Sequence, residues 1–216
     1  MVLTVPNAKQ MKTATYSLSF TTGTLLYRES MVVAEQFLVL QNWAAVREVV
    51  VGQNLLQART LNTSRRVFQE VSSRLRTLRD PELRLLLRGT LQEQGYLLWL
   101  GVCRRYPFIA DFAKEILHEQ FTNLKNVLTY EDFDVFFNGK AEWHQELERI
   151  QPSTKAKLRQ VLFKMLREAG LLTSDNQIIP ALLSPSLVQA LGQDHFRDYR
   201  VFPAFEPDPR QWISSP

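Results

Sequence analysis

Cysteine, histidine and glycine are all scarce in this chain of 216 residues, and each scarcity argues against a class of chemistry. The single cysteine, Cys103, lies in an apolar run and has no partner for an intramolecular disulfide, which fits the reducing cytosol. The three histidines, His118, His144 and His195, are far apart, and none has a second His or Cys at the spacing of a metal site. The eight glycines form no phosphate-binding loop of the G-x-x-x-x-G-K-[ST] type. We therefore predict a non-enzyme, with no catalytic residues, no cofactor and no metal.

Long apolar runs are also missing. No segment reaches the roughly 18 consecutive apolar residues of a membrane span, and the first 15 residues lack the apolar core of a signal peptide. These absences predict a cytoplasmic protein without membrane contact. We also expect a monomer.

The charge that is present is unevenly distributed. The chain carries a net charge of +4, but residues 1–110 hold 14 Lys and Arg against 7 Asp and Glu, whereas residues 111–216 hold 12 against 15. Residues 59–88 contain eight Arg and no Lys. Guanidinium groups suit bidentate contacts with phosphate, although a GC-rich genome would produce the same bias without any function.

Residues 62–79 show the clearest pattern in the chain, that of an amphipathic helix with Asn62 as its N-cap. At about 100° per residue, five apolar side chains share one arc: Val67, Phe68, Val71, Leu75 and Leu78. Polar side chains gather on the opposite side: Arg65, Arg66, Gln69, Ser73 and Arg76. This outer face is either an ordinary solvated surface or a contact with nucleic acid. Glu70 can pair with Arg66 or Arg74, and we expect Arg74 and Arg79, which flank the apolar arc, to be structural.

A second basic face is expected on a helix over residues 154–169, which starts at Ser153 and stops at Gly170. Its outer side includes the other predicted nucleic-acid contacts: Lys157, Lys164 and Arg167. The segment 171–183 that follows has the pattern of a short β-hairpin, with Pro180 placing its second strand at an edge. Helix and hairpin together are typical of a winged-helix unit, but a small hairpin beside a helical bundle would have the same pattern.

The remaining segments predict a mostly α protein. We divide the chain into a flexible arm (1–15), a helical bundle with the Arg-rich helix (16–151), a winged-helix-like subdomain (152–199) and a Pro/aromatic tail (200–216) that is not helical and whose aromatic side chains pack on the body or on a partner. Residues 16–26 are expected to be a short extended segment, and residues 91–105 the most buried helix. Asp80, Thr129 and Ser184 are predicted helix caps, and Asn138-Gly139 a turn after a helix over 130–137.

Three stretches resemble the BrxA family of the BREX bacteriophage-exclusion systems: YSLSFTTGTLLYRESMVVAEQFL, WAAVREVVVGQNLLQARTLNTSRRVFQEVSSRLRTL and LRQVLFKMLREAGLLTSDNQIIPALLSPSLVQAL. The order and spacing of the matching positions carry the likeness, which covers roughly residues 16–191. The helical part is also similar to the bundle of the transcription antitermination factor NusB.

The resemblance implies a double-stranded DNA-binding accessory component of a phage-defence system, with other BREX proteins as partners. It transfers no residue role beyond a basic helix close to nucleic acid. The alternative is an adaptor that docks other BREX components without touching nucleic acid.

Overall fold

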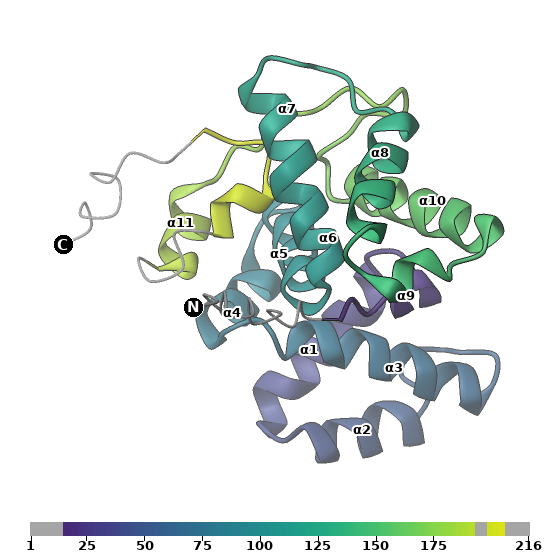
Figure 1. Cartoon of the computed structure of the whole chain (residues 1–216). Coiled ribbons are helices and arrows are strands. Elements are labelled where there is room, and N and C mark those ends of the chain that lie inside the picture. Colours follow the sequence, from purple (N-terminus) through teal and green to yellow (C-terminus); the bar gives the residue numbers. More distant parts are fainter. Residues whose placement is uncertain (1–14, 193–197, 206–216) are drawn as a thin grey trace, which may run out of the picture.

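The computed structural model describes residues 15–192 and 198–205, and this part of the chain is built from helices joined by short connections (Figure 1). The elements in chain order are η1 (Ser19–Thr22), α1 (Tyr27–Leu40), α2 (Trp43–Gly52), α3 (Leu61–Leu75), α4 (Asp80–Arg88), α5 (Leu91–Arg105), α6 (Pro107–Phe112), η2 (Ala113–His118), α7 (Glu119–Thr122), α8 (Tyr130–Ala141), α9 (Gln145–Glu148), α10 (Pro152–Glu168) and α11 (Pro185–Leu191). The prediction of a mostly α protein is confirmed. The likeness to NusB stays a prediction.

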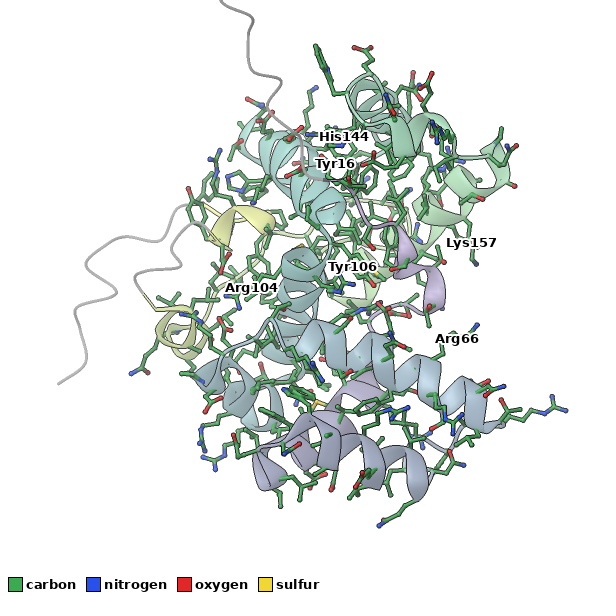
Figure 2. The ribbon with its side chains drawn as sticks, turned by 60° about the horizontal axis from the view of Figure 1, so that its bottom comes forward. Tyr16, Arg66, Arg104, Tyr106, His144 and Lys157 are labelled. Carbon is green, nitrogen blue, oxygen red and sulfur yellow. The ribbon has the colours of Figure 1, made fainter. Side chains whose placement is uncertain are left out.

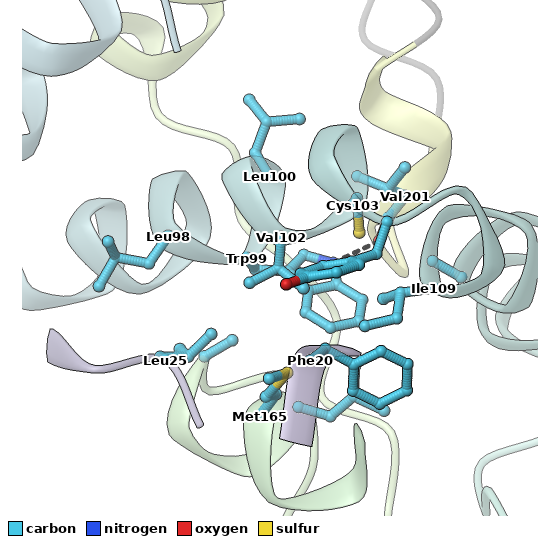
Figure 3. Close-up of a cluster of buried hydrophobic side chains, with 14 of the residues drawn as sticks. Phe20, Leu25, Leu98, Trp99, Leu100, Val102, Cys103, Ile109, Met165 and Val201 are labelled. Atoms are coloured by element: carbon cyan, nitrogen blue, oxygen red, sulfur yellow. Dashed lines mark hydrogen bonds between the residues drawn. The ribbon is translucent and has the colours of Figure 1, made fainter. Parts of the chain in front are cut away.

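Helix α5 is the centre of the core, as its apolar sequence predicts. Residues from Tyr96 to Cys103 are buried on every side of the helix, and they pack against η1, α10 and the segment 198–205 (Figure 3). Two glycines allow neighbouring backbones to come close: a Cβ on Gly95 would lie 3.2 Å from the carbonyl oxygen of Ala169, and one on Gly101 would lie 3.3 Å from that of Arg74. Helix α5 therefore fixes where α3 and α10 lie relative to each other.

Three of six predicted helix caps lie where the sequence places them. Asn42 accepts hydrogen bonds from the backbone of α2, Thr129 forms a capping box with Asp132, and Ser184 caps α11. Three predicted caps are shifted: Thr60 rather than Asn62 caps α3, Arg79 precedes α4 with Asp80 inside it, and α10 begins at Pro152, before Ser153. Thr60 accepts a hydrogen bond from the backbone of Thr63 in α3, and Glu82 of α4 accepts one from the backbone of Arg79, whereas no side chain caps α10.

Other predicted boundaries are wrong. Residues 19–22 form a 3₁₀ helix instead of an extended segment, and α8 continues through Asn138-Gly139 to Ala141. The Arg-rich helix ends at Leu75, four residues before its predicted end at Arg79. Residues 107–122 form consecutive helical elements, from α6 to α7, with a π-helical portion, η2, in the middle.

The β-hairpin predicted after α10 does not form strands. The described residues contain two isolated antiparallel bridges, Leu172 with Ile178 and Val127 with Gln177. The loop is hydrogen-bonded like a hairpin, because Thr173 donates to the carbonyl of Gln177, but its second arm also pairs with residues 126–128 before Pro180 removes a donor. Because the hydrogen bonds of this arm are divided between two partners, it forms no continuous strand with either of them. The winged-helix interpretation stays a prediction.

The described start of the Pro/aromatic tail packs on the body, as predicted for its aromatic side chains. Phe202 is fully buried, the indole of Trp99 donates to the carbonyl of Val201 at 2.8 Å, and a ring nitrogen of His118 lies 2.8 Å from the carbonyl of Phe202. A short 3₁₀ turn at residues 198–201 corrects the expectation that no part of this stretch is helical. Phe205 is exposed, although its ring lies 4.8 Å from that of Phe121, and Trp212, the third aromatic residue of the tail, lies outside the described residues.

A network of buried ion pairs ties α4, α5 and α11 together. The carboxylate of Glu82, which is fully buried, accepts hydrogen bonds from Arg79 at 2.6 Å and from Arg104 at 2.7 and 2.8 Å. Arg104 also pairs with Asp198 at 2.6 Å, and Arg79 donates to the carbonyl oxygens of Ala190 and Leu191 at the end of α11. Burial alone would raise the pKa of Glu82, but the two guanidinium groups outweigh it and hold that pKa below its ordinary value.

Candidate nucleic-acid interface

Helix α3 has one buried and one exposed face, and the exposed face carries the predicted contacts. Phe68, Val71 and Leu75 are buried against the core. The exposed side chains on the other face are Arg65, Arg66, Gln69 and Arg76. Ser73 is half-buried, and its hydroxyl donates to the carbonyl of Glu70 in its own helix. Four of the five predicted side chains on this helix are thus available to a ligand.

A buried pair explains which arginines are left free. Glu70 pairs with Arg74 at 2.8 Å and accepts a second hydrogen bond from the hydroxyl of Tyr106 at 2.6 Å. Burial, followed by that hydrogen bond, raises the pKa of Tyr106 to about 12, so the phenol keeps its proton and remains a donor. Arg74 also donates to the carbonyl of Thr24, which confirms its predicted structural role. Since Glu70 is engaged, Arg66 projects to solvent without a carboxylate partner within the described residues.

The exposed arginines of α3 border a groove that α2 completes. Its volume is about 490 Å³, and six of the seven residues that line it are of polar or charged types: Arg47, Arg65, Phe68, Gln69, Ser72, Ser73 and Arg76. Sequence reasoning missed Arg47. The helical periodicity of α2 could have indicated its position, because Arg47 lies four residues after Trp43 and next to the inward-facing Val46. The packing of α2 against α3, which brings Arg47 to the groove, could not be seen in the sequence.

Arg76 is held in place by an aromatic stack. Its guanidinium lies 5.0 Å from the centre of the Trp43 ring, and that ring stacks on Phe37 at 4.1 Å. A cation–π contact of this kind restricts the side chain without neutralising its charge. Neither Arg47, Arg65 nor Arg76 forms an ion pair within the parts of the chain that the structure covers. The groove between α2 and α3, which we call the arginine groove, therefore gathers positive charge that the described protein does not compensate.

The second predicted face, on α10, is only partly available. Lys157 and Lys164 are exposed, with the ammonium of Lys157 3.2 Å from the Gln160 amide oxygen and that of Lys164 3.8 Å from Glu168. Arg167 is half-buried and donates to the Asn176 side chain at 2.6 Å. Its guanidinium thus holds the loop that follows α10, which makes it a weaker candidate contact than the two lysines.

The segment around η1 connects the two basic faces. It packs against both α3 and α10. Figure 2 shows Arg66 and Lys157 on the same side of the molecule with this segment between them, and Figure 1 places the first turns of α3 and α10 on that side as well. The segment contributes the hydroxyls of Ser17, Ser19 and Thr21, of which Ser19 and Thr21 are exposed. Hydroxyl and basic side chains on one surface are the groups that bind phosphate oxygens.

Other kinds of site find little support in the described part of the chain. Residues 15–192 and 198–205 contain no group of three or more His, Cys, Asp and Glu placed to hold a metal ion. Within the same ranges, none of the helices is long and apolar enough to cross a membrane. Cys103 is buried, and burial raises the pKa of its thiol well above the ordinary value, which disfavours the reactive thiolate.

Fold and surface together define a small helical-bundle protein that presents, along one side, arginines with no ion pair among the described residues. The chain belongs to the BrxA family, because the sequence model described as BrxA matches residues 14–195. The family resemblance seen in the sequence is thereby confirmed.

Named relatives agree with this assignment. The chain is 32% identical over 148 residues to the BREX protein BrxA of Escherichia coli O9:H4 (strain HS), covering 68% of this chain and 70% of the relative. It is 26% identical over 162 residues to the BREX protein BrxA of Bacillus cereus (strain H3081.97), covering 72% and 81%. The fold is similar to the crystal structure of an uncharacterized protein from Magnetospirillum magneticum, with a TM-score of 0.73, 19% identity, and coverage of 87% and 96%. The last comparison concerns the fold alone.

Proposed function

We propose that this protein is a non-enzymatic component of a BREX phage-defence system that binds double-stranded DNA through the arginine groove and the neighbouring lysines of α10. The observation that carries the proposal is the set of exposed cations on one side of the molecule: Arg47, Arg65, Arg66, Arg76, Lys157 and Lys164. Among the described residues, Lys164 is the one member of this set with an ion pair, to Glu168 at 3.8 Å. The protein would act in the cytoplasm, as a monomer and together with other BREX proteins.

The chemistry of the surface favours contacts with the DNA backbone over contacts with bases. Guanidinium groups match the geometry of phosphate oxygens, and the four arginines of the set have no carboxylate to displace among the described residues. Phosphate contacts fix the position of a protein on a duplex but carry no sequence information. We therefore expect affinity for duplex DNA of any sequence, with little preference among sites.

Salt dependence tests this proposal directly. If the six cations each neutralise one phosphate, a plot of log Kobs against log salt concentration should have a slope of about −5, and affinity should fall about 10³-fold between roughly 50 and 200 mM salt. Fluorescence anisotropy with a labelled duplex of random sequence would measure the slope. Binding that ignores salt, or no binding at the lowest salt, would contradict the proposal.

The adaptor role is a second candidate function, and a different surface favours it. Helices α4 and α11 border another groove, which lies away from the first turns of α3 and α10 and includes three apolar residues in its lining, Pro81, Leu85 and Ala190. Docking of BREX components through such a surface is compatible with DNA binding on the other side. A pull-down with each purified BREX protein, with and without residues 206–216, would show whether the tail predicted to contact partners takes part, because this truncation keeps the buried Val201 and Phe202.

A further inference from the structure

The groove between α4 and α11 combines positive charge with an apolar lining. It has a volume of about 440 Å³ and is lined by Pro81, Arg84, Leu85, Arg88, Ser186, Gln189 and Ala190. Arg84 and Arg88 are exposed, lie one helical turn apart on α4, and form no ion pair with any described residue. Ser186 and Gln189 on α11 add exposed hydrogen-bonding groups.

The shape of this groove is fixed by the buried ion pairs beneath it. Arg79 joins Glu82 of α4 to the carbonyl oxygens of Ala190 and Leu191, so the end of α11 is attached directly to α4. Leu187 and Leu191 are buried on the inner side of α11 and Leu83 and Leu86 on that of α4. A groove held in this way exists before a ligand arrives, which reduces the entropy lost on binding.

We infer that this groove is a docking site for an acidic amphipathic helix of a protein partner. Two carboxylates four residues apart on such a helix would match the spacing of Arg84 and Arg88. An apolar side chain between them would cover Leu85, Pro81 and Ala190. The hydroxyl of Ser186 and the amide of Gln189 would meet polar groups at the rim.

The lining distinguishes this site from the arginine groove. Three of its seven lining residues are apolar and two are arginines, whereas the arginine groove has three arginines and one apolar residue, Phe68. A rigid duplex cannot insert apolar groups into a recess of this size, but a peptide side chain can. In Figure 1, α4 and α11 lie on the left of the molecule, opposite the first turns of α3 and α10, so DNA bound there would leave this groove open.

The test uses the full chain and a synthetic peptide of about 18 residues, long enough to form an amphipathic helix. The peptide carries two glutamates four residues apart beside leucines, and a control peptide has glutamine in their place. Anisotropy of the labelled peptides would be measured with the unmodified protein, with R84Q/R88Q and with R84E/R88E. Thermal unfolding checks that both variants, which change only exposed side chains, remain folded.

We expect the glutamate peptide to bind about tenfold more weakly to R84Q/R88Q, the effect of losing two exposed ion pairs, and the glutamine peptide to bind the unmodified protein equally weakly. R84E/R88E should prefer a lysine version of the peptide. The inference is overturned if the glutamate peptide fails to bind, or binds all proteins alike. The inference is also overturned if R84E/R88E loses affinity for duplex DNA as strongly as an α3 variant does, because the groove would then bind DNA. A change in the mass of R84E/R88E in solution would overturn it as well, because the groove would then bind a second copy of the chain.

Discussion

Replacing both Arg65 and Arg66 with glutamate should lower the affinity for duplex DNA by about 60-fold at roughly 0.1 M salt. Each phosphate contact contributes about 0.9 to the exponent of the salt dependence, and at this concentration the loss of two contacts corresponds to a factor of about 10^1.8. The slope of log Kobs against log salt should fall by about 2 at the same time. Titration of a labelled duplex at several salt concentrations measures both quantities.

The choice of these two arginines follows from their surroundings. Both are exposed in the first half of α3, and neither takes part in packing or in an ion pair among the described residues. Arg76 is less suitable, because its guanidinium stacks on Trp43 and its loss would disturb α2 as well. Glutamate at position 66 would lie four residues before Glu70, but Glu70 is paired with Arg74 and the added repulsion is small.

A matched control separates local contact from overall charge. K125E/R200E makes the same change in net charge at two exposed residues away from the arginine groove. This variant should keep its affinity within about threefold, because charges farther away than a Debye length are largely screened. Equal losses in the two variants would mean that net charge, and not the α3 surface, holds the DNA.

The sequence predicted the exposed face of α3 because helical periodicity separates its two sides without ambiguity. Phe68, Val71 and Leu75 fall on one side, and any packing of this helix must turn Arg65 and Arg66 outward. The predicted structural role of Arg74 followed from the same geometry. These features depend on local order, which the sequence encodes directly.

Features that depend on tertiary packing could not be predicted in the same way. Arg47 belongs to the arginine groove only because α2 packs on α3, and Arg167 is drawn away from the basic face by Asn176, nine residues later in a loop. The expected hairpin became a loop with isolated bridges because residues 126–128 take part of its hydrogen bonding. Long-range partners decided each of these outcomes.

Replacing Glu82 with glutamine should lower the free energy of unfolding by about 3 kcal/mol near neutral pH. Removing one partner of a buried ion pair leaves the other charge without compensation, and such losses are typically about 3–5 kcal/mol. The lower end applies here because Arg104 keeps Asp198 and the side chain of Arg79 is 34% exposed. Urea unfolding followed by circular dichroism would measure the difference.

The loss of stability in E82Q should depend on pH, and the direction of this dependence follows from the lowered pKa of Glu82. A carboxyl whose pKa is lower in the folded state than in the unfolded state stabilises the protein at pH values above the unfolded pKa, which is close to 4.5. This stabilisation is lost as the pH falls through the folded pKa. The difference between the unmodified protein and E82Q should therefore shrink as the pH falls below the unfolded value and through the lower folded value. Glu93 and Glu146, whose pKa values are also lowered, are present in both proteins and do not contribute to the difference.

E48Q is the control for this experiment, because Glu48 is exposed and has no ion pair with a described residue. Its unfolding free energy should stay within about 0.5 kcal/mol of the unmodified protein at every pH. If E82Q were as stable as E48Q, or if its deficit stayed constant down to the pH at which the unmodified protein unfolds, the carboxylate of Glu82 would not be the charge that joins α4 to α5 and α11. A deficit that shrinks with acid identifies that charge, and it links the stability of the fold to the network that shapes the groove between α4 and α11.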